Sequence, residues 1–266
     1  MSGYAAEVWA RGLATLLAAI LCVAAATPCA AVAQSRTITV FDNLVPTAAE
    51  PSPRDRIVLL EARLSREPAD YELRWRAAEA YAQIGLTEPD SEIQGQLWSR
   101  AYDHATAATA SEPNGLEGHY WLAVVASLFA EVSGGREKIR MGDQAYRESA
   151  WVLEVDSLHA GAHYLQGRIH AAVMRLSSVM RFLAKLLVGG EALDGASWEQ
   201  AEFHLRRAAE LQPELAMHHF ELAMTYERMD MPEEMRRALL TAVGASNAAP
   251  FQEEYKERAR KLLGEP

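Results

Sequence analysis

Small and apolar residues recur along this chain at a spacing that predicts a series of similar helical hairpins. In each copy, a small residue lies ten positions after the residue that marks a turn. The turn and small residues of the four copies are Pro68 and Ala78, Pro113 and Ala123, Ser157 and Gly167, and Pro213 and Ala223. Between these markers the apolar positions follow the period of an α-helix, and the alternation typical of β-strands is nearly absent. The pattern therefore predicts an all-α protein made of repeated helix–turn–helix units.

The small residues also predict how these helices pack. Two helices cross closely only where their side chains are small, and larger residues such as Leu122 and Leu222 fill the space between the crossings. The residues expected at the crossings are Ala78, Ala101, Ala108, Ala123, Ala145, Gly167, Ala201, Ala208 and Ala223. Their spacing resembles the tetratricopeptide repeat of about 34 residues, whose hairpins stack into an α-solenoid.

We expect one repeat domain at residues 54–266, preceded by a signal peptide at 1–33 and a proline-containing linker at 34–53. The domain begins with a half-repeat and ends with a capping helix that has one charged face. The predicted units are the half-repeat 54–68, the repeats 71–113, 116–157, 160–213 and 216–245, and the capping helix 247–264. The third repeat exceeds the ideal length by about twenty residues, which predicts an inserted helix.

The first 33 residues have the pattern of a secretory signal peptide. Arg11 precedes an uncharged apolar run, and an A-x-A sequence ends at Ala33, so we expect cleavage between Ala33 and Gln34. This pattern predicts an exported protein of the periplasm or envelope. The alternative is an inner-membrane anchor, because residues 12–33 are long enough to span a bilayer. Both cysteines, Cys22 and Cys29, lie in this segment, so the mature chain is expected to contain no disulfide.

Charge and composition narrow the range of partners. The formal net charge is −10, and half of the residues are hydrophobic, which is sufficient for a sizeable core. Binding to nucleic acid requires a basic surface that neutralises phosphates, so the charge argues against nucleic acid as a partner. A protein or peptide is therefore the expected partner.

The first helix of each predicted hairpin carries an aromatic residue at its fifth position. These residues are Trp75, Tyr120, Tyr164 and Phe220, and the residues one turn further along are Glu79, Val124, Arg168 and Met224. First helices line the inner groove of this repeat class, and aromatic residues and arginine are frequent anchors of partner binding. We therefore expect these eight residues to line a partner-binding groove. The alternative is that the aromatic residues only pack against the next helix.

Arg168 has two interpretations within this groove. Its planar guanidinium could bind a carboxylate of the partner. It could instead form an ion pair with a groove glutamate such as Glu117 or Glu227, because a partly buried arginine is rarely left unpaired. The sequence alone leaves both interpretations open.

The insertion in the third repeat predicts an amphipathic helix at residues 175–188. Its apolar face consists of Leu176, Val179, Met180, Leu183, Leu186 and Leu187. Its other face carries Ser178 and the basic residues Arg175, Arg181 and Lys185. A basic amphipathic helix can lie on a membrane surface. We expect this helix to dock on its own domain instead, as most apolar helix faces do.

The sequence contains no arrangement typical of an enzyme or a metal site. The pair His159 and His163 offers at most two ligands, and no cysteine, histidine or carboxylate set completes a metal site. The motifs of nucleophilic hydrolases, P-loop proteins, zinc proteases and dinucleotide-binding proteins are absent. We therefore predict that the protein is not an enzyme and binds neither a metal nor a cofactor.

Several segments are more specific than the general repeat pattern. They are GGREKIRMG at 134–142, HYLQGR at 163–168, LSSV at 176–179, WEQA at 198–201 and AELQP at 209–213. Together they resemble the regulator of microtubule dynamics family over residues 113–245. The resemblance implies an all-helical repeat domain without enzymatic activity, and eukaryotic members are linked to microtubules and organelle membranes. The secretory leader departs from that setting.

These observations predict a non-enzymatic, exported scaffold or adaptor that binds a partner peptide or helix in the concave groove. Three alternatives remain at this point. The first is a cytoskeleton- or membrane-associated protein similar to the regulators of microtubule dynamics. The second is a structural spacer of an envelope complex, which would tolerate substitutions in the groove. The third is an enzyme built on the repeats, which would need a polar cluster that the sequence does not show.

Overall fold

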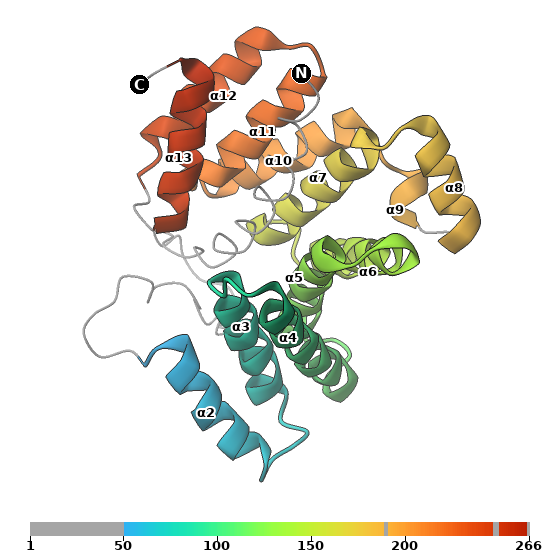
Figure 1. Ribbon diagram of the computed structural model, residues 1–266, viewed down its shortest axis with the longest axis vertical. Helices are drawn as coiled ribbons and strands as arrows, with labels where there is room; N and C mark the ends of the chain where they lie inside the picture. The colour runs from blue at the N-terminus through green and yellow to red at the C-terminus, as the bar shows by residue number, and fades with distance from the viewer. Residues whose placement is uncertain (1–50, 189–190, 247–249, 265–266) are drawn as a thin grey trace, which may run out of the picture.

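Twelve α-helices and no β-strand make up the part of the chain that the computed structural model describes, namely residues 51–188, 191–246 and 250–264. The helices, labelled as in Figure 1, are α2 (Pro53–Leu64), α3 (Tyr71–Leu86), α4 (Ser91–Ser111), α5 (Leu116–Val132), α6 (Gly135–Val155), α7 (Ala160–Arg175), α8 (Ser178–Val188), α9 (Glu191–Asp194), α10 (Trp198–Leu211), α11 (Ala216–Arg228), α12 (Pro232–Gly244) and α13 (Pro250–Leu263). The predicted all-α class is confirmed. The predicted signal peptide, its cleavage site at Ala33 and Gln34, and most of the predicted linker lie outside the described residues.

The helices pair into hairpins that stack in chain order. The most extensive packing joins α3 with α4, α5 with α6, α7 with α10 and α11 with α12. Helix α2 packs on α3 at one end of the stack, and α13 packs on α11 and α12 at the other (Figure 1). The short helices α8 and α9 leave the stack between α7 and α10 and contact α6. The result is an α-solenoid in which each hairpin covers the apolar face of the next.

Polar side chains fix the starts of several helices. Asp70 accepts a hydrogen bond from the backbone N–H of Leu73 at 2.8 Å, and Ser197 accepts one from Gln200 at 3.1 Å. His159 performs the same function for α7 through its Nδ1 atom, which lies 3.1 Å from the N–H of Ala162. Each contact satisfies a backbone donor that the helix itself leaves free.

The predicted packing residues are all buried, and Gly167 shows why such positions must be small. A Cβ atom at residue 167 would lie 2.6 Å from Leu205 Cγ and 3.1 Å from the carbonyl oxygen of Ala201. Helices α7 and α10 therefore approach each other so closely at Gly167 that any residue with a Cβ atom would clash there. Alanine residues occupy the corresponding crossings of the other hairpins and are likewise inaccessible to solvent.

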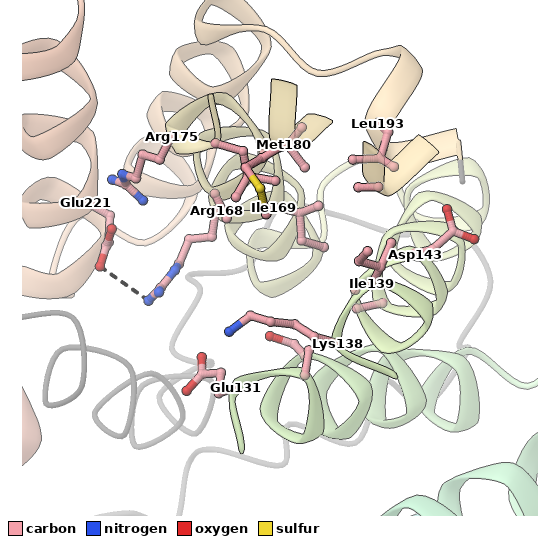
Figure 2. A pocket seen from close by; sticks show the side chains of 18 of the residues that line it. Glu131, Lys138, Ile139, Asp143, Arg168, Ile169, Arg175, Met180, Leu193 and Glu221 are labelled. Carbon is pink, nitrogen blue, oxygen red and sulfur yellow. Dashed lines mark ion pairs between the residues drawn. The ribbon is translucent and has the colours of Figure 1, made fainter. Parts of the chain in front are cut away.

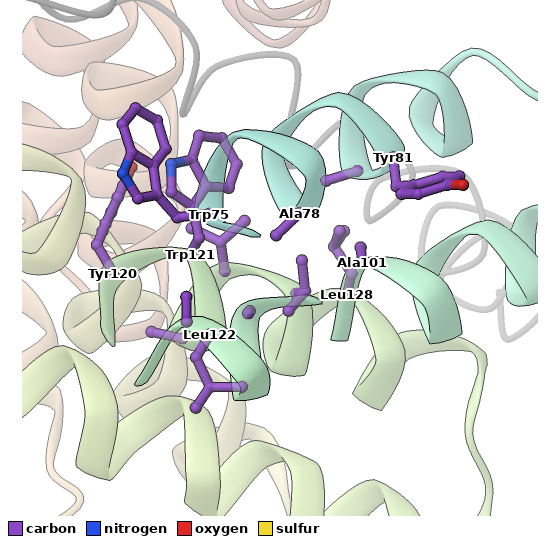
Figure 3. Packing of buried hydrophobic residues seen from close by; sticks show 14 of the residues in the cluster. Trp75, Ala78, Tyr81, Ala101, Tyr120, Trp121, Leu122 and Leu128 are labelled. Carbon is purple, nitrogen blue, oxygen red and sulfur yellow. The ribbon is translucent and has the colours of Figure 1, made fainter. Parts of the chain in front are cut away.

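Two main clusters of buried side chains form the core. The first joins α3, α4 and α5, and Figure 3 shows Trp75, Tyr120 and Trp121 at one end of it and Tyr81 at the other. The second joins α7, α10, α11, α12 and α13 around Tyr164, Phe220 and Tyr255. The region between the two clusters, where α5 and α6 face α7 and α11, contains the pocket described below.

One residue near the start of each hairpin's first helix bonds to the turn before it. The residue lies six positions after the turn residue and donates a side-chain hydrogen bond to the carbonyl oxygen of that turn residue. The four contacts are Arg74 Nε to Pro68 at 2.8 Å, His119 Nε2 to Pro113 at 3.0 Å, His163 Nε2 to Ser157 at 3.1 Å and His219 Nε2 to Pro213 at 2.9 Å. We call these four side chains the turn-binding residues.

In three hairpins the turn-binding residue also contacts the second helix of its own hairpin. The contacts are Arg74 Nη1 to His104 Nδ1 at 3.2 Å, His119 Nδ1 to Glu148 Oε2 at 2.6 Å and His163 Nδ1 to His204 Nδ1 at 2.9 Å. His104, Glu148 and His204 all lie nine positions before the next turn residue. A single side chain thus ties together the turn, the first helix and the second helix of each of these hairpins.

Candidate functional site

A pocket of about 650 Å³ opens between the α5–α6 hairpin, helices α7 and α8, and helix α11 (Figure 2). Its apolar lining residues are Ala130, Ile139, Ala145, Ile169, Ala172, Val173, Leu176, Met180, Ala184, Leu193, Phe220 and Met224. Its charged lining residues are Glu131, Arg136, Lys138, Asp143, Arg168, Arg175, Glu221, Glu227, Arg228 and Arg258. A large, mostly apolar concavity with a few convergent polar groups is the usual form of a binding site.

Arg168 lies at the centre of the charged groups. Its Nη1 atom is 3.3 Å from Glu221 Oε1 and donates a hydrogen bond of 3.1 Å to Tyr164 Oη. Both partners of the ion pair are buried, and Figure 2 shows them extending towards each other from α7 and α11. Burial acts to lower the pKa of Arg168, but Glu221, with smaller effects of Tyr164, Tyr255 and Glu131, outweighs it and raises the pKa. The guanidinium is therefore charged and held in one orientation.

Two further charged side chains leave polar atoms unsatisfied. The buried Nη1 atom of Arg258 and the buried Oε2 atom of Glu131 have no hydrogen-bond partner among the described residues. The guanidinium of Arg258 lies over the ring of Phe220, 4.3 Å from its centroid, which holds the group at the pocket wall. Burial raises the pKa of Glu131 well above its usual value, although Arg168 and Lys138 act in the opposite direction. Unsatisfied buried groups are uncommon in native proteins, and these two belong to residues that line the pocket, where a ligand could satisfy them.

The structure divides the eight predicted groove residues between the pocket and the core. Arg168, Phe220 and Met224 line the pocket. Tyr164 lies directly beneath Arg168 and has no exposed surface. The other four, Trp75, Glu79, Tyr120 and Val124, are buried in or beside the first core cluster, and none of them lines the pocket. The pocket therefore uses the groove positions of the third and fourth hairpins.

Glu79 is a buried carboxyl group outside the pocket. Its Oε1 atom accepts a hydrogen bond of 3.1 Å from Gln83, and no ion pair to Glu79 is found in the described part of the chain. Burial raises the pKa of Glu79 to about 7, while Arg56 and Arg76 lower it. The group therefore titrates close to neutral pH, although it lies in the core.

The prediction of the ion-pair partner of Arg168 was wrong. The predicted alternatives were Glu117 and Glu227, whereas Arg168 pairs with Glu221. Glu227 lines the same pocket, and Glu117 lies on α5 near Arg76. Sequence periodicity placed Glu227 on the correct helix, α11, but could not establish which turn of α11 faces α7.

The inserted helix also differs from the prediction. Arg175 is the last residue of α7, and α8 begins only at Ser178. Ser177 Oγ caps the new helix by accepting a hydrogen bond of 3.2 Å from Met180 N. Arg175 therefore lines the pocket rather than joining Arg181 and Lys185 on α8. Burial lowers the pKa of Arg175.

The orientation of α8 separates its apolar residues into two groups. Met180 and Ala184 line the pocket, although Met180 is itself 53% exposed, and Val179, Phe182 and Leu186 are exposed by 64%, 65% and 72%. Lys185 forms an ion pair with Asp194 of α9. Helix α8 therefore docks on the domain through Met180 and Ala184, and its predicted apolar face as a whole is not buried.

Sequence reasoning missed several polar residues of the pocket, among them Glu131, Glu221 and Arg258. Glu131 lies at the end of α5, Glu221 directly follows Phe220 on α11, and Arg258 belongs to the charged face of the capping helix α13. That charged face suggested a solvent-exposed surface, and only the packing of α13 on α11 places Arg258 over Phe220. The aromatic residue at the fifth helix position was the available signal for its neighbour Glu221.

Within the described ranges, no group of three or more metal-binding side chains could hold a metal ion. Of the helices that the structure describes, none is long and apolar enough to cross a membrane.

The stacked hairpins define a class of protein, the tetratricopeptide-like α-solenoids. A thermophilic TPR protein from Thermus thermophilus has the same fold, with a TM-score of 0.56 and 19% sequence identity over 79% of this chain and 90% of its own. The structure of MamA gives a TM-score of 0.46 and 12% identity, covering 79% of this chain and 91% of that one. The family of regulator of microtubule dynamics proteins 1–3 matches residues 42–265, and the chain belongs to this family. No curated protein matches the chain in sequence.

The family match confirms the resemblance seen at residues 113–245 and extends it over most of the repeat domain. The tetratricopeptide-like fold is used typically by non-catalytic scaffolds that bind other proteins along a concave surface.

Proposed function

We propose that this protein is a non-enzymatic scaffold that binds a segment of a partner protein in the pocket between α5, α7 and α11. The observation that carries the proposal is the pair of unsatisfied buried atoms, Arg258 Nη1 and Glu131 Oε2, in a mostly apolar concavity of about 650 Å³. A partner could satisfy both atoms while burying apolar surface. The class of fold agrees with such a role, because stacked hairpins offer an extended binding surface.

The chemistry of the lining residues favours binding over catalysis. No histidine lines the pocket, and Ser127 is the single hydroxyl-bearing residue among the lining residues. A nucleophile needs an adjacent base that is itself oriented by a third group. The central charged groups, Arg168 and Glu221, are instead paired with each other.

We further propose that the protein acts outside the cytoplasm, in the periplasm or envelope. The support is the sequence of residues 1–33, in which Arg11, an apolar run and an A-x-A sequence follow one another. Under the alternative, residues 12–33 remain as an inner-membrane anchor, and the repeat domain would still face the envelope. Comparing the mass of the mature protein with that of the full chain distinguishes the two.

The proposal is tested by capturing partners with residues 34–266 from an envelope extract after mild crosslinking. The decisive variant is Arg168→Gln with Glu221→Gln, which replaces the buried ion pair by two neutral amides of similar shape. The matched control is Arg207→Gln with Glu210→Gln, which does the same to an exposed pair on α10 whose atoms lie 3.1 Å apart. We expect the same partner with the wild type and the control, and its loss with the pocket variant. An identical set of captured proteins from all three, with unchanged helical circular dichroism, would contradict binding at this pocket.

The family match supports a second candidate function. The family is described as regulators of microtubule dynamics, and it matches residues 42–265. Under this candidate the repeat domain would bind microtubules or a membrane next to them. Co-sedimentation of residues 34–266 with polymerised tubulin tests it, and recovery of the protein in the supernatant at all tubulin concentrations would argue against it.

A further inference from the structure

The pocket is more basic than the protein that contains it. Six basic and four acidic residues line it, whereas the whole chain has a formal net charge of −10. One of the four acids, Glu131, is buried, and burial raises its pKa well above the usual value, which reduces the negative charge in the pocket further. Arg168 and Glu221 neutralise each other. The remaining charge therefore favours an anionic group in the ligand.

The two unsatisfied groups differ in the partners they can take. Arg258 Nη1 is a donor and needs an acceptor, for which a carboxylate has the right charge and geometry. The raised pKa of Glu131 favours the protonated carboxyl group, which can donate one hydrogen bond and accept others. A peptide supplies partners for both groups, because its side chains can carry a carboxylate and its backbone carries N–H and C=O groups. A fatty acid carries a single polar group for both.

The walls of the pocket accept aliphatic side chains. Ile139 on α6 and Ile169 on α7 contribute apolar surface between the charged groups, and Met180 on α8 contributes another wall. Burial of a leucine-sized side chain against these walls removes apolar surface from water and so favours binding. Aliphatic residues on either side of an acidic residue could therefore occupy these walls while the carboxylate reaches Arg258.

We propose that the pocket recognises an acidic residue flanked by aliphatic residues in a peptide segment of the partner. The carboxylate binds Arg258, the peptide backbone forms hydrogen bonds with Glu131, and the aliphatic side chains pack on Ile139, Ile169 and Met180. This inference rests on the proposed function, since it names the chemistry of the partner segment.

Short peptides test this chemistry without the natural partner. The probes are N-acetyl-Leu-Glu-Leu-amide and N-acetyl-Leu-Gln-Leu-amide, which differ only in the charge of the central residue. Methyl signals of ¹³C-methionine report on the site, because Met180 and Met224 line the pocket, whereas Met217 is buried in the second core cluster and does not line it. We expect the glutamate probe to shift Met180 and Met224 with a Kd on the order of 1 mM, and the glutamine probe to bind about tenfold more weakly.

A pair of variants tests the assignment of the carboxylate to Arg258. Arg258→Gln should weaken the glutamate probe about tenfold and leave the glutamine probe unchanged. Arg260→Gln removes an arginine of the same helix that does not line the pocket, and it should bind both probes like the wild type. An unchanged Met217 signal establishes that each variant is folded.

Three outcomes would overturn the proposal. Equal binding of the two probes would show that the pocket does not require a carboxylate. The absence of any shift at Met180 and Met224 would show that the pocket does not bind the peptide. Decanoate that shifts these methyl groups more strongly than the glutamate probe would assign the pocket to fatty acids. If the probes do not bind but the partner is still captured, only this inference is refuted. If the probes bind but no partner is captured, the proposed scaffold function is refuted.

Discussion

The Nε2 atom of His119 lies 3.0 Å from the carbonyl oxygen of Pro113. The same contact recurs in the other three hairpins with Arg74, His163 and His219, so the repeat preserves the hydrogen bond while the residue type changes. In His119, the second ring nitrogen lies 2.6 Å from Glu148 Oε2, and the ring stacks on Trp151 with centroids 3.8 Å apart. The turn-binding residue therefore contributes both hydrogen bonds and packing to its hairpin.

Replacing His119 separates these two contributions. We expect His119→Ala to lower the free energy of unfolding by about 1–3 kcal/mol, because the Pro113 carbonyl and Glu148 both lose a donor. His119→Arg should retain most of the stability, since Arg74 makes the equivalent hydrogen bond in the first hairpin. Urea unfolding followed by circular dichroism measures both. Equal destabilisation of the two variants would show that stacking on Trp151, rather than hydrogen bonding, is what matters.

The close approach of α7 and α10 predicts an unusual response to alanine. Gly167→Ala should lower the free energy of unfolding by about 1–3 kcal/mol, because its Cβ would lie 2.6 Å from Leu205 Cγ and 3.0 Å from Leu205 N. Gly142→Ala in α6 is the matched control, because nothing lies within 4 Å of its Cβ, and alanine favours the helix by about 1 kcal/mol. Thermal unfolding of the two variants should shift in opposite directions. A stabilised Gly167→Ala variant would contradict the packing described here.

Glu79 predicts a loss of stability as the pH rises. Its pKa is about 7 in the folded protein and 4.5 in an unfolded chain, so between these values the folded state binds the additional proton. Stability therefore decreases as the pH rises through this window. Glu79→Gln does not titrate, so its free energy of unfolding relative to the wild type should rise by about 3 kcal/mol as the pH increases from 4.5 to 8.

Denaturant unfolding at several pH values measures that difference. Glu72→Gln removes an exposed carboxylate from the same helix and controls for the loss of a negative charge. A constant difference between Glu79→Gln and the wild type across the window would mean that Glu79 is ionised in the folded protein.

His204 predicts the opposite dependence at acidic pH. Burial, followed by the neighbouring His163 and His170, lowers the pKa of His204 to about 4 from 6.5. The unfolded chain therefore binds a proton in this window that the folded protein does not, and stability falls as the pH falls from 6.5 to 4. His163 Nε2 donates to Ser157, so its Nδ1 accepts the hydrogen bond from His204 Nδ1.

A glutamine at position 204 can keep that hydrogen bond without titrating. We expect His204→Gln to lose less stability than the wild type on acidification, by at most about 1.4 kcal/mol per pH unit. Unfolding curves of both proteins across the window from pH 6.5 to 4 provide the measurement. Parallel losses in the two proteins would assign the acid sensitivity to other groups, such as His218, whose pKa burial lowers to about 3.

The repeat architecture was predictable because it depends on local spacing. Each marker residue, such as Ala123 or Gly167, contacts elements that are near in sequence, so the period of the sequence reports directly on the packing. The turn-binding residues could have been found in the same way, since all four lie six positions after a turn residue. Their differing side chains concealed the relationship.

The pocket was only partly predictable because distant elements build it. Arg168, Phe220 and Met224 followed from the groove pattern, whereas Glu131 and Arg258 come from α5 and α13, which are far apart in the sequence. Their positions depend on how the hairpins rotate against each other, which the period does not encode. The break after Arg175 had a local signal, the helix cap at Ser177, that amphipathic periodicity concealed.

The insertion between α7 and α10 has a consequence for how this architecture can diversify. The two helices pack as a complete hairpin around Gly167 and Leu205, and α8 and α9 form an excursion from one end of it. Met180, Ala184 and Leu193 on this excursion provide one wall of the pocket without joining the two main core clusters. The sequence of α8 and α9 can therefore change without disturbing the two main core clusters, and relatives that differ in this segment could have different ligand preferences on the same stack of hairpins.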